Sequence, residues 1–281
     1  TSEDPYKVSS AEELNNVRYY LNDTTVYFKQ TADIDLADYL ASDGAGYNDG
    51  KGWEPIGTVG KAFGGKYDGS GKTISGLTIN RDSDYQGLFG YIGNAVTLEN
   101  ISLIGVNIKG GKYVGGLVGF VVNGTIENCN VTGEVTGSNS DFYAGVGGLV
   151  GYNYGAIKKC YSTCSVSGHY NVGGLIGYNF STGSVKDSYA TGSVNGDDYL
   201  GGLVGKNIKS VENSYALGAV SAGDNTGGLV GINSALAGGK TYTGTITSSY
   251  YDSATTGQSD TGKGEGKPTD EMQTATPFTG W

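Results

Sequence analysis

Few residues in this sequence of 281 could perform chemistry on a substrate. The chain has one histidine, His169, and three cysteines, Cys129, Cys160 and Cys164. A zinc peptidase of the H-E-x-x-H kind needs two histidines, so the sequence excludes that class. A Ser-His-Asp triad would have to use His169, and the chain has no G-x-S-x-G nucleophile elbow. Because His169 falls in a turn between two repeats, we expect it to be a solvated turn residue.

The cysteines could act as nucleophiles beside His169 or form a disulfide. Cys129 and Cys160 occupy equivalent positions of neighbouring repeats, which places them near the Cα separation of about 5.5 Å that a disulfide requires. The alternation of residue types around all three cysteines points their side chains inward. We therefore expect core packing, and the sequence leaves open whether Cys129 and Cys160 are bonded.

Carboxylates could support a polysaccharide lyase or hydrolase, which needs clustered acids or bound Ca²⁺. One column of charged residues, Glu127, Lys158, Lys186 and Glu212, mixes both signs, which favours a solvated face with cross-strand pairs. A second acidic group lacks the spacing of a calcium loop, and whether it holds an ion stays open. Its members are Asp33, Asp35, Asp38, Asp43 and Asp49. We therefore predict no catalytic residue, no metal site and no cofactor.

Tyrosine is the residue type whose spacing most favours binding. Several of the 22 tyrosines recur at equivalent positions of a repeat and are expected on its outer face. Flat aromatic rings bind sugar faces and protein partners at a low cost in conformational entropy. The alternative is a stacked ladder that stiffens the fold. We predict a ligand surface on two flanks, Tyr161, Tyr189, Tyr215 and Tyr250 on one, and Tyr152 and Tyr178 on the other.

A repeated core must position these residues. The pentapeptide GGLVG, or a variant of it, recurs at spacings of 26 to 32 residues. Its leucines are Leu88, Leu117, Leu149, Leu175, Leu203 and Leu229. A helical repeat of this period needs runs of good helix formers, whereas here glycine alternates with β-branched residues. We expect three short strands per period, stacked into a solenoid whose successive copies bury a continuous core.

Alignment of the segments between the cores predicts which side chains point inward. Two inner columns are expected, made of Cys129, Cys160, Ser188, Ser214 and Ser249, and of Val135, Val166, Val194 and Val220. An asparagine follows four of the cores, and stacked amides can hydrogen-bond from turn to turn at about 4.8 Å. These are Asn153, Asn179, Asn207 and Asn233. With right-handed crossovers, the predicted fold is an all-β, right-handed parallel β-helix.

The ends of such a solenoid need covers, because open strand edges invite aggregation. Residues 8–23 combine an S-x-x-E capping box with an apolar stripe, which predicts an N-terminal helix. Residues 24–36 are expected to form a strand pair, 37–53 a surface loop, 252–267 a loop, and 268–281 a short closing helix with an apolar tail. We therefore divide the chain into an N-terminal cap (1–56), a β-helix with the repeats (57–257) and a C-terminal loop and cap (258–281).

The net charge of the chain limits the kinds of partner that it can bind. The formal net charge is −10, from 28 acidic and 18 basic residues, which argues against nucleic acid and anionic lipid. No apolar run reaches about 18 residues, so we expect no direct membrane insertion by this chain. Thr1 does not begin a signal peptide, and we expect a secreted or cell-surface protein whose signal peptide has been removed.

The repeated GGLVGYN core, with the CY and GSVSG segments after it, resembles the GLUG motif family. The resemblance covers about residues 87–257. It implies a location in secreted or surface proteins of bacteria and archaea, which include adhesins and the non-catalytic part of IgA-cleaving metallopeptidases. It implies no ligand and no catalytic residues.

The sequence as a whole favours a non-catalytic extracellular or cell-surface module for adhesion, for binding a glycan or protein ligand, or for presenting a neighbouring domain. Two alternatives stay open. One is a self-assembling surface-layer or filament subunit, and the other is a polysaccharide lyase or hydrolase on a β-helix.

Overall fold

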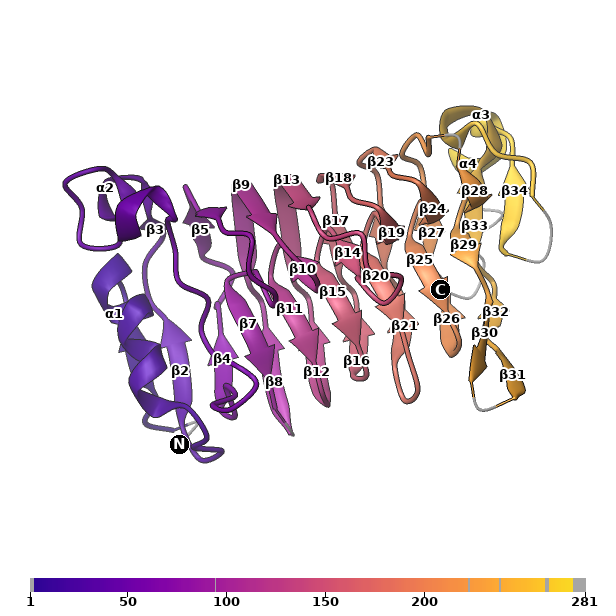
Figure 1. Cartoon of the computed structure of the whole chain (residues 1–281). Coiled ribbons are helices and arrows are strands. Elements are labelled where there is room, and N and C mark those ends of the chain that lie inside the picture. Colours follow the sequence, from indigo (N-terminus) through magenta and orange to yellow (C-terminus); the bar gives the residue numbers. More distant parts are fainter. Residues whose placement is uncertain (1–2, 94, 222, 238, 261–262, 275–281) are drawn as a thin grey trace.

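The chain folds into a parallel β-solenoid, in which strands of successive turns lie side by side (Figure 1). The computed structural model describes residues 3–93, 95–221, 223–237, 239–260 and 263–274. The molecule is elongated, with helix α1 (Ala11–Asn16) at its N-terminal end and helices α3 (Ser253–Thr256) and α4 (Thr269–Met272) at the other.

Each central turn passes through four sheets, which we call D, C, A and B in chain order. In one turn, β14 (Val146–Gly147) lies in sheet D, β15 (Val150–Asn153) in sheet C, and β16 (Ala156–Lys158) in sheet A. β17 (Tyr161–Ser162) and β18 (Ser165–Ser167) follow in sheet B. The prediction of three strands per period was wrong, because the GGLVG core contributes one strand on each side of its leucine.

Neighbouring strands in the four sheets pair in parallel. Sheet A also contains β1 (Tyr6–Val8), β2 (Tyr27–Gln30), β4 (Lys66–Asp68), β8 (Val96–Glu99), β12 (Gly124–Glu127), β21 (Ser184–Lys186), β26 (Ser210–Glu212) and β32 (Thr245–Thr247). Sheet B also contains β3 (Ile34–Asp35), β5 (Thr73–Ser75), β6 (Thr78–Asn80), β9 (Ser102–Gly110), β13 (Asn130–Gly137), β22 (Tyr189–Ala190), β23 (Val194–Asn195), β27 (Tyr215–Ala216), β33 (Tyr250–Asp252) and β34 (Glu265–Lys267). Sheet C also contains β7 (Phe89–Ile92), β11 (Val118–Val121), β20 (Ile176–Asn179), β25 (Val204–Asn207) and β29 (Val230–Ile232). Sheet D also contains β10 (Val114–Gly115), β19 (Tyr170–Gly173), β24 (Asp198–Gly201) and β28 (Asp224–Gly227).

The leucines of the repeated core point into the solenoid, as the sequence predicts. All six are fully buried and belong to one continuous apolar cluster. The two predicted inner columns, of cysteine and serine and of valine, are buried as well. Each turn thus contributes one layer to a core that no single repeat could bury by itself.

The glycines of GGLVG let the backbones of sheets C and D touch. A Cβ atom on Gly147 would lie 2.2 Å from the carbonyl oxygen of Val150, and one on Gly151 would lie 2.6 Å from the backbone nitrogen of Val114. Real Cβ atoms do not approach backbone atoms this closely. The motif therefore requires glycine because backbone segments of the same core and of neighbouring turns approach each other closely. The leucine and the residue after it are buried in the core.

The predicted asparagine ladder is present in sheet C. Asn153 Nδ2 donates to Asn179 Oδ1 at 2.9 Å, Asn179 Nδ2 to Asn207 Oδ1 at 2.8 Å, and Asn207 Nδ2 to Asn233 Oδ1 at 2.7 Å. The first three asparagines are fully buried. The ladder ties neighbouring turns together through side chains as well as through the backbone.

The N-terminal helix is shorter than predicted. Only α1 and the following 3-10 helix η1 (Val17–Tyr20) are helical within residues 8–23, and Val8 belongs to strand β1. The capping box holds, because Ser10 Oγ accepts from the Glu13 N–H. Val8 instead pairs with Gln30 and extends sheet A, and the β-branched and aromatic residues of η1 are weak helix formers.

The segment 37–53 is only partly the surface loop that we expected. It holds α2 (Ala37–Leu40) and the 3-10 helix η2 (Asn48–Gly50), and it ends in Trp53, which is buried. The indole N–H of Trp53 donates to the Leu88 carbonyl at 3.1 Å. The buried Trp53 therefore fixes this segment to the solenoid. The acidic composition of the segment gave no indication of this contact.

The segment 252–267 is likewise more ordered than the predicted loop. The Asp252 carboxylate accepts from two N–H groups of α3, and β34 pairs with β33 as a last strand of sheet B. The predicted closing helix is confirmed as α4, whereas the apolar tail lies outside the described residues. Between β29 and β32, an antiparallel hairpin of β30 (Ser234–Ala237) and β31 (Lys240–Thr243) projects from the solenoid. Among the described residues, no helix has both the length and the apolar character to cross a bilayer.

Candidate functional site

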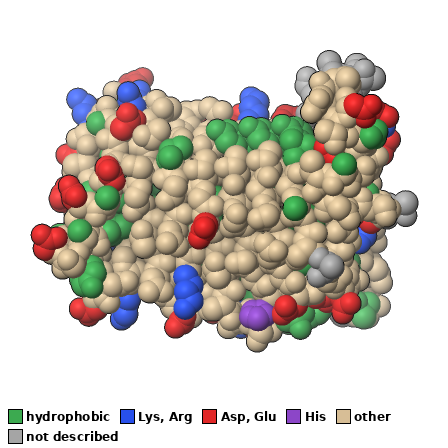
Figure 2. Space-filling model, turned by 90° about the horizontal axis from the view of Figure 1, so that it is seen from above, with side chains coloured by type: hydrophobic (Ala, Val, Ile, Leu, Met, Phe, Trp, Pro, Cys, Tyr) green, Lys and Arg blue, Asp and Glu red, His purple; other side chains and the backbone are tan. Residues whose placement is uncertain are grey.

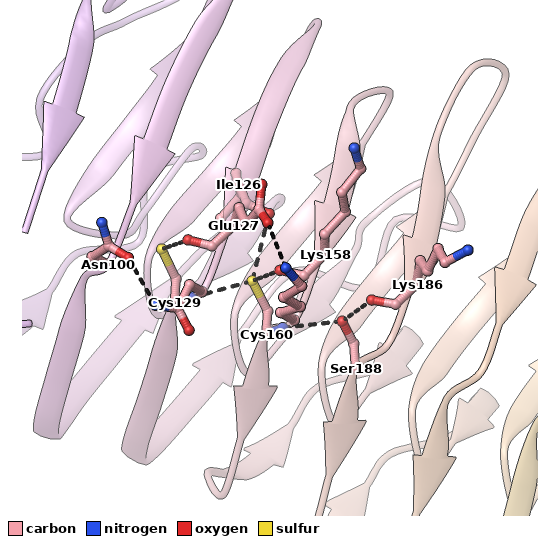
Figure 3. A network of polar contacts seen from close by, with 10 residues as sticks. Asn100, Ile126, Glu127, Cys129, Lys158, Cys160, Lys186 and Ser188 are labelled. Carbon is pink, nitrogen blue, oxygen red and sulfur yellow. Dashed lines mark hydrogen bonds and ion pairs between the residues drawn. The ribbon is translucent and has the colours of Figure 1, made fainter. Parts of the chain in front are cut away.

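The column of cysteines and serines is a hydrogen-bond ladder at the corner between sheets A and B (Figure 3). The Cys129 N–H donates to Cys160 Sγ at 3.4 Å, and the Cys160 N–H donates to Ser188 Oγ at 3.1 Å. The same contact continues over the next two turns. Each thiol or hydroxyl in turn donates to the carbonyl two residues before it, as Ser188 Oγ does to Lys186 O at 2.7 Å. The sequence indicated the inward direction of this column but not its hydrogen bonds.

The three cysteines are buried, free thiols. Cys129 and Cys160, whose bonding the sequence left open, therefore share a hydrogen bond and not a disulfide. Burial raises the pKa of Cys129, and it raises the pKa of Cys164 to about 11. Both groups stay protonated near neutral pH, and a protonated, buried thiol is a poor nucleophile.

The single histidine lies between β18 and β19, at the predicted turn. His169 Nδ1 lies 2.6 Å from Asp197 Oδ2 in the next turn, and both side chains are substantially exposed. Figure 2 shows the histidine at an edge of the molecule, beside acidic side chains. This is an exposed polar pair between two turns.

The charged column on sheet A forms exposed ion pairs between neighbouring turns. Lys186 Nζ lies 2.9 Å from Glu212 Oε1, and Lys159 Nζ lies 3.2 Å from Glu127 Oε1. Exposed pairs of this kind contribute little to stability, which agrees with a solvated face. In the acidic N-terminal segment, Asp33 accepts from a backbone N–H. No three His, Cys, Asp or Glu side chains in the described part of the chain are placed to hold a metal ion.

The first predicted tyrosine column is a stacked ladder on the outer face of sheet B. The rings of Tyr161 and Tyr189 lie 4.9 Å apart and 2° from parallel, and those of Tyr189 and Tyr215 lie 4.9 Å apart and 5° from parallel. Tyr250 continues the register, and Lys267 Nζ lies 5.8 Å from its ring centroid. The stacked rings cover one another's flat faces, so the ladder presents mainly ring edges and hydroxyls to solvent.

The second predicted pair belongs to another aromatic column, on sheet C. Tyr91, Phe120, Tyr152 and Tyr178 occupy equivalent positions of successive turns. Phe120 stacks 5.0 Å from Tyr152 at an angle of 7°, whereas Tyr152 and Tyr178 are tilted by 57°. Tyr152 and Tyr178 are almost completely buried, and burial raises the pKa of both. Both tyrosines of this second pair line a groove.

The next position of this column is occupied by Lys206, which pairs in register with Tyr178. Its ammonium nitrogen lies 4.9 Å from the ring centroid of Phe142, 5.0 Å from that of Tyr178 and 5.2 Å from that of Tyr199. Only 6% of the residue is exposed. Burial lowers the pKa of Lys206, and the charge of Asp198 partly opposes this. Within the described residues, no carboxylate lies within ion-pairing distance of this ammonium group.

A groove of about 940 Å³ opens above Lys206, between sheet C, the loop of residues 138–145 and the β30–β31 hairpin. Its lining combines aromatic rings, two lysines, hydroxyl groups and aliphatic side chains, without an acidic side chain among the described residues. The lining residues are Phe142, Tyr143, Tyr152, Tyr178, Phe180, Ser181, Tyr199, Lys206, Ile208, Lys209, Ile232, Ser234, Ala235, Leu236, Thr241 and Tyr242. Four of them are large and exposed: Phe142 by 43%, Tyr143 by 63%, Leu236 by 75% and Tyr242 by 47%.

Tyr199 reaches the groove from a backbone conformation that belongs to the repeat. Its φ of 58° lies in the left-handed region, as do those of Asn171 and Asn225 at the same position of the neighbouring turns. Its ring packs edge-on against Phe142, with centroids 5.2 Å apart at 88°. The backbone and the ring contact together fix one wall of the lysine cage.

Sequence analysis identified Tyr152 and Tyr178 but missed the other groove residues. The signal for Lys206 was present, because GGLVGKN replaces the GGLVGYN and GGLIGYN of the two preceding cores. Phe142 and the hairpin have no equivalent in the repeat. Their place could be learned only from the fold.

The fold and these contacts define a parallel β-solenoid of glycine-rich repeats. A family model described as the GLUG motif matches residues 110–136, 143–167 and 168–195. These matches confirm the resemblance that the sequence indicated. They include Tyr152 and Tyr178 of the groove, whereas Phe142 lies between the first two matches.

Two curated relatives share part of the chain. Halomucin of Haloquadratum walsbyi is 40% identical over 155 residues, which cover 54% of this chain and 2% of halomucin. A protein of Evansella cellulosilytica, provisionally named as a Gly-rich membrane protein, is 35% identical over 187 residues, which cover 54% of this chain and 20% of that protein. The chain thus spans a small part of each relative.

Two solved structures share the fold. A crystal structure from Bacteroides ovatus, provisionally described as an immunoglobulin A1 protease, matches with a TM-score of 0.73 and 21% identity, over 100% of this chain and 88% of that one. A second chain, described as IgA1 Protease, matches with a TM-score of 0.58 and 19% identity, over 88% of this chain and 19% of the other. At these identities the likeness concerns the fold.

Proposed function

We propose that this chain is a non-catalytic, extracellular or cell-surface module that binds a ligand in the groove above Lys206 and thereby serves adhesion. The observation that carries the proposal is the lysine cage. A mostly buried ammonium group faces a groove lined with aromatic rings and lacks an acidic partner among the described residues. Concave sites with a few placed polar groups are where ligands bind.

The relatives support the surface location. One is named halomucin and another carries a name as a membrane protein, and each matches 54% of this chain. The rigid, elongated solenoid suits a module that presents one face to a partner, and it could equally hold a neighbouring domain at a distance. The chemistry described above supports a non-catalytic role, because Cys129 and Cys164 are buried and protonated and His169 is paired at an exposed turn.

A binding survey with a groove-filling variant tests this proposal. Purified protein is applied to a glycan array and to immobilised surface glycoproteins. Ala235→Trp should abolish binding because Ala235 lines the groove. Ala254→Trp is the matched control, since Ala254 is exposed on α3, outside the groove lining. Binding that survives Ala235→Trp would place the ligand elsewhere and refute the proposed site.

Two further measurements address the alternative functions. Reducing-sugar release from a polysaccharide panel, with and without Ca²⁺, should show no turnover, and clear turnover would make the protein an enzyme. Light scattering should show discrete particles, whereas long polymers would favour a self-assembling surface-layer or filament subunit.

A further inference from the structure

The floor of the groove holds a positive charge that the protein itself leaves uncompensated. Three aromatic rings surround the Lys206 ammonium at about 5 Å, and its strongest carboxylate influence comes from Asp198, which is beyond ion-pairing distance. Asp198 is engaged elsewhere, since it accepts from the Tyr199 N–H and from Asn225 Nδ2. A partly buried cation with no carboxylate within ion-pairing distance is a favourable place for an anionic group.

The rest of the lining supplies the contacts that a sugar needs. Ring faces of aromatic residues pack against the C–H faces of pyranose rings, and tyrosine adds a hydroxyl for hydrogen bonding. Tyr242 stands half-exposed at the rim, and Ser181, Ser234 and Thr241 contribute further hydroxyls to the lining. Lys209 is a second positive side chain in the same groove.

We propose that this groove binds a saccharide that carries a carboxylate, with the carboxylate against Lys206 and the sugar ring against the neighbouring aromatic side chains. The inference rests on the proposed ligand-binding function and adds the chemical class of the ligand. It requires an isolated carboxylate on a flat, hydroxylated ring, as in hexuronic and sialic acids.

Other anionic partners fit the groove less well. A densely charged polyanion such as nucleic acid would be repelled by a chain of net charge −10. An extended peptide commonly binds by adding a strand to a free sheet edge. Strand β25, which carries Lys206, offers none, because it pairs with β20 on one side and with β29 on the other. Complementary local charge and ring stacking therefore favour the acidic saccharide.

Isothermal titration with matched ligand pairs tests the proposal. The probes are galacturonate and its methyl ester, sialyllactose and its methyl ester, and an oligoglutamate peptide. Within each saccharide pair the rings are the same, whereas the carboxylate is free in only one. We expect the free acid of at least one pair to bind about tenfold or more tightly than its neutral partner, as for a hydrogen bond to a charged group.

Two substitutions at Lys206 and one control complete the design. Lys206→Met keeps an unbranched side chain in the cage but removes the charge, and should abolish the preference for the acid. Lys206→Arg should keep that preference. Lys186→Met removes a positive charge on sheet A, where Lys186 pairs with Glu212, and should leave binding unchanged. Circular dichroism confirms the fold of each variant.

The outcomes separate this inference from the proposed function. If neutral sugars bind as well as acids, or the peptide binds instead, and Ala235→Trp abolishes that binding, the groove is a binding site and the acidic-saccharide proposal is wrong. If binding is insensitive to Ala235→Trp, both proposals fail. Absence of binding by every acidic saccharide probe overturns the acidic-saccharide proposal, and the wider survey then tests the groove.

Discussion

Substitution of Asn179 by alanine should destabilise the solenoid strongly, although Asn179 lies far from both capped ends of the solenoid. Asn179 is fully buried in the middle of the asparagine ladder. Its Oδ1 accepts from Asn153 at 2.9 Å, and its Nδ2 donates to Asn207 at 2.8 Å. The substitution removes both contacts and leaves a small space that no neighbouring side chain fills.

The size of the loss in stability depends on which hydrogen bonds Asn153 and Asn207 keep after the substitution. Asn153 Nδ2 retains its second hydrogen bond, to Gly155 O at 3.0 Å, but one of its two N–H groups loses its partner. Asn207 Oδ1 still accepts from the Lys209 N–H, at a longer 3.2 Å. One unpaired buried donor and one weakened acceptor together cost about 2–4 kcal/mol, because each unsatisfied group costs about 1–3 kcal/mol.

Denaturant unfolding followed by far-UV circular dichroism measures this loss. The control is Asn195→Ala, since Asn195 is exposed on β23, where a substitution changes stability by about 0.5 kcal/mol or less. The slope of the transition should be compared as well, because repeat proteins can lose two-state behaviour. If Asn179→Ala unfolds with the same free energy as the control, the ladder does not contribute as its geometry indicates.

Three further results are expected. Gly151→Ala should destabilise the protein by more than about 2 kcal/mol, as for other overpacked sites, because its Cβ would meet backbone atoms at 2.6 Å. Gly60→Ala, with nothing within 4 Å, should be neutral, and equal stability of the two variants would contradict the proposed contact of sheets C and D. Cys160→Ser should destabilise the protein less than Cys160→Ala in the same unfolding assay, because serine occupies this position in the next turn and still accepts the hydrogen bond from the Cys129 N–H. Ellman's reagent should react with the thiols only after unfolding, and rapid reaction of the native protein would contradict their burial. Binding of an acidic saccharide should weaken as pH rises toward 10, earlier than the ordinary lysine pKa of about 10.4 predicts, because burial lowers the pKa of Lys206 and its neutral form loses the charge contact. Titrations between pH 7 and pH 10 check this, the Lys206→Arg variant should hold its affinity, and an unchanged wild-type affinity would refute the assignment of Lys206.

The solenoid was predictable because a repeated period fixes the register. Once the leucines are aligned, the alternation of strands determines which columns face inward, and the asparagine and cysteine–serine columns follow from the same alignment. The two strands within each GGLVG core were not predictable in this way. They depend on close contact between two backbones, which a sequence reveals only as glycine.

The groove was harder to predict for a different reason. Its residues come from a loop at 138–145, from successive strands of sheet C and from the β30–β31 hairpin. Those segments are far apart in the sequence, and two of them interrupt the repeat. The tyrosine columns were visible as a pattern, but the orientation of their rings depends on the packing of neighbouring turns.

The contrast between the two aromatic columns gives a reason for the proposed binding site to lie where the repeat changes. On sheet B, Tyr161, Tyr189 and Tyr215 are stacked nearly parallel, so each ring satisfies its neighbours and offers little to a partner. On sheet C the column changes from Tyr178 to Lys206, whose ammonium group faces the Tyr178 ring and has no acidic partner among the described residues. A periodic array that pairs every group with its own copy has few contacts left for a ligand. The break in the column, beside the non-repeated loop and hairpin, is therefore the position at which we place the proposed ligand.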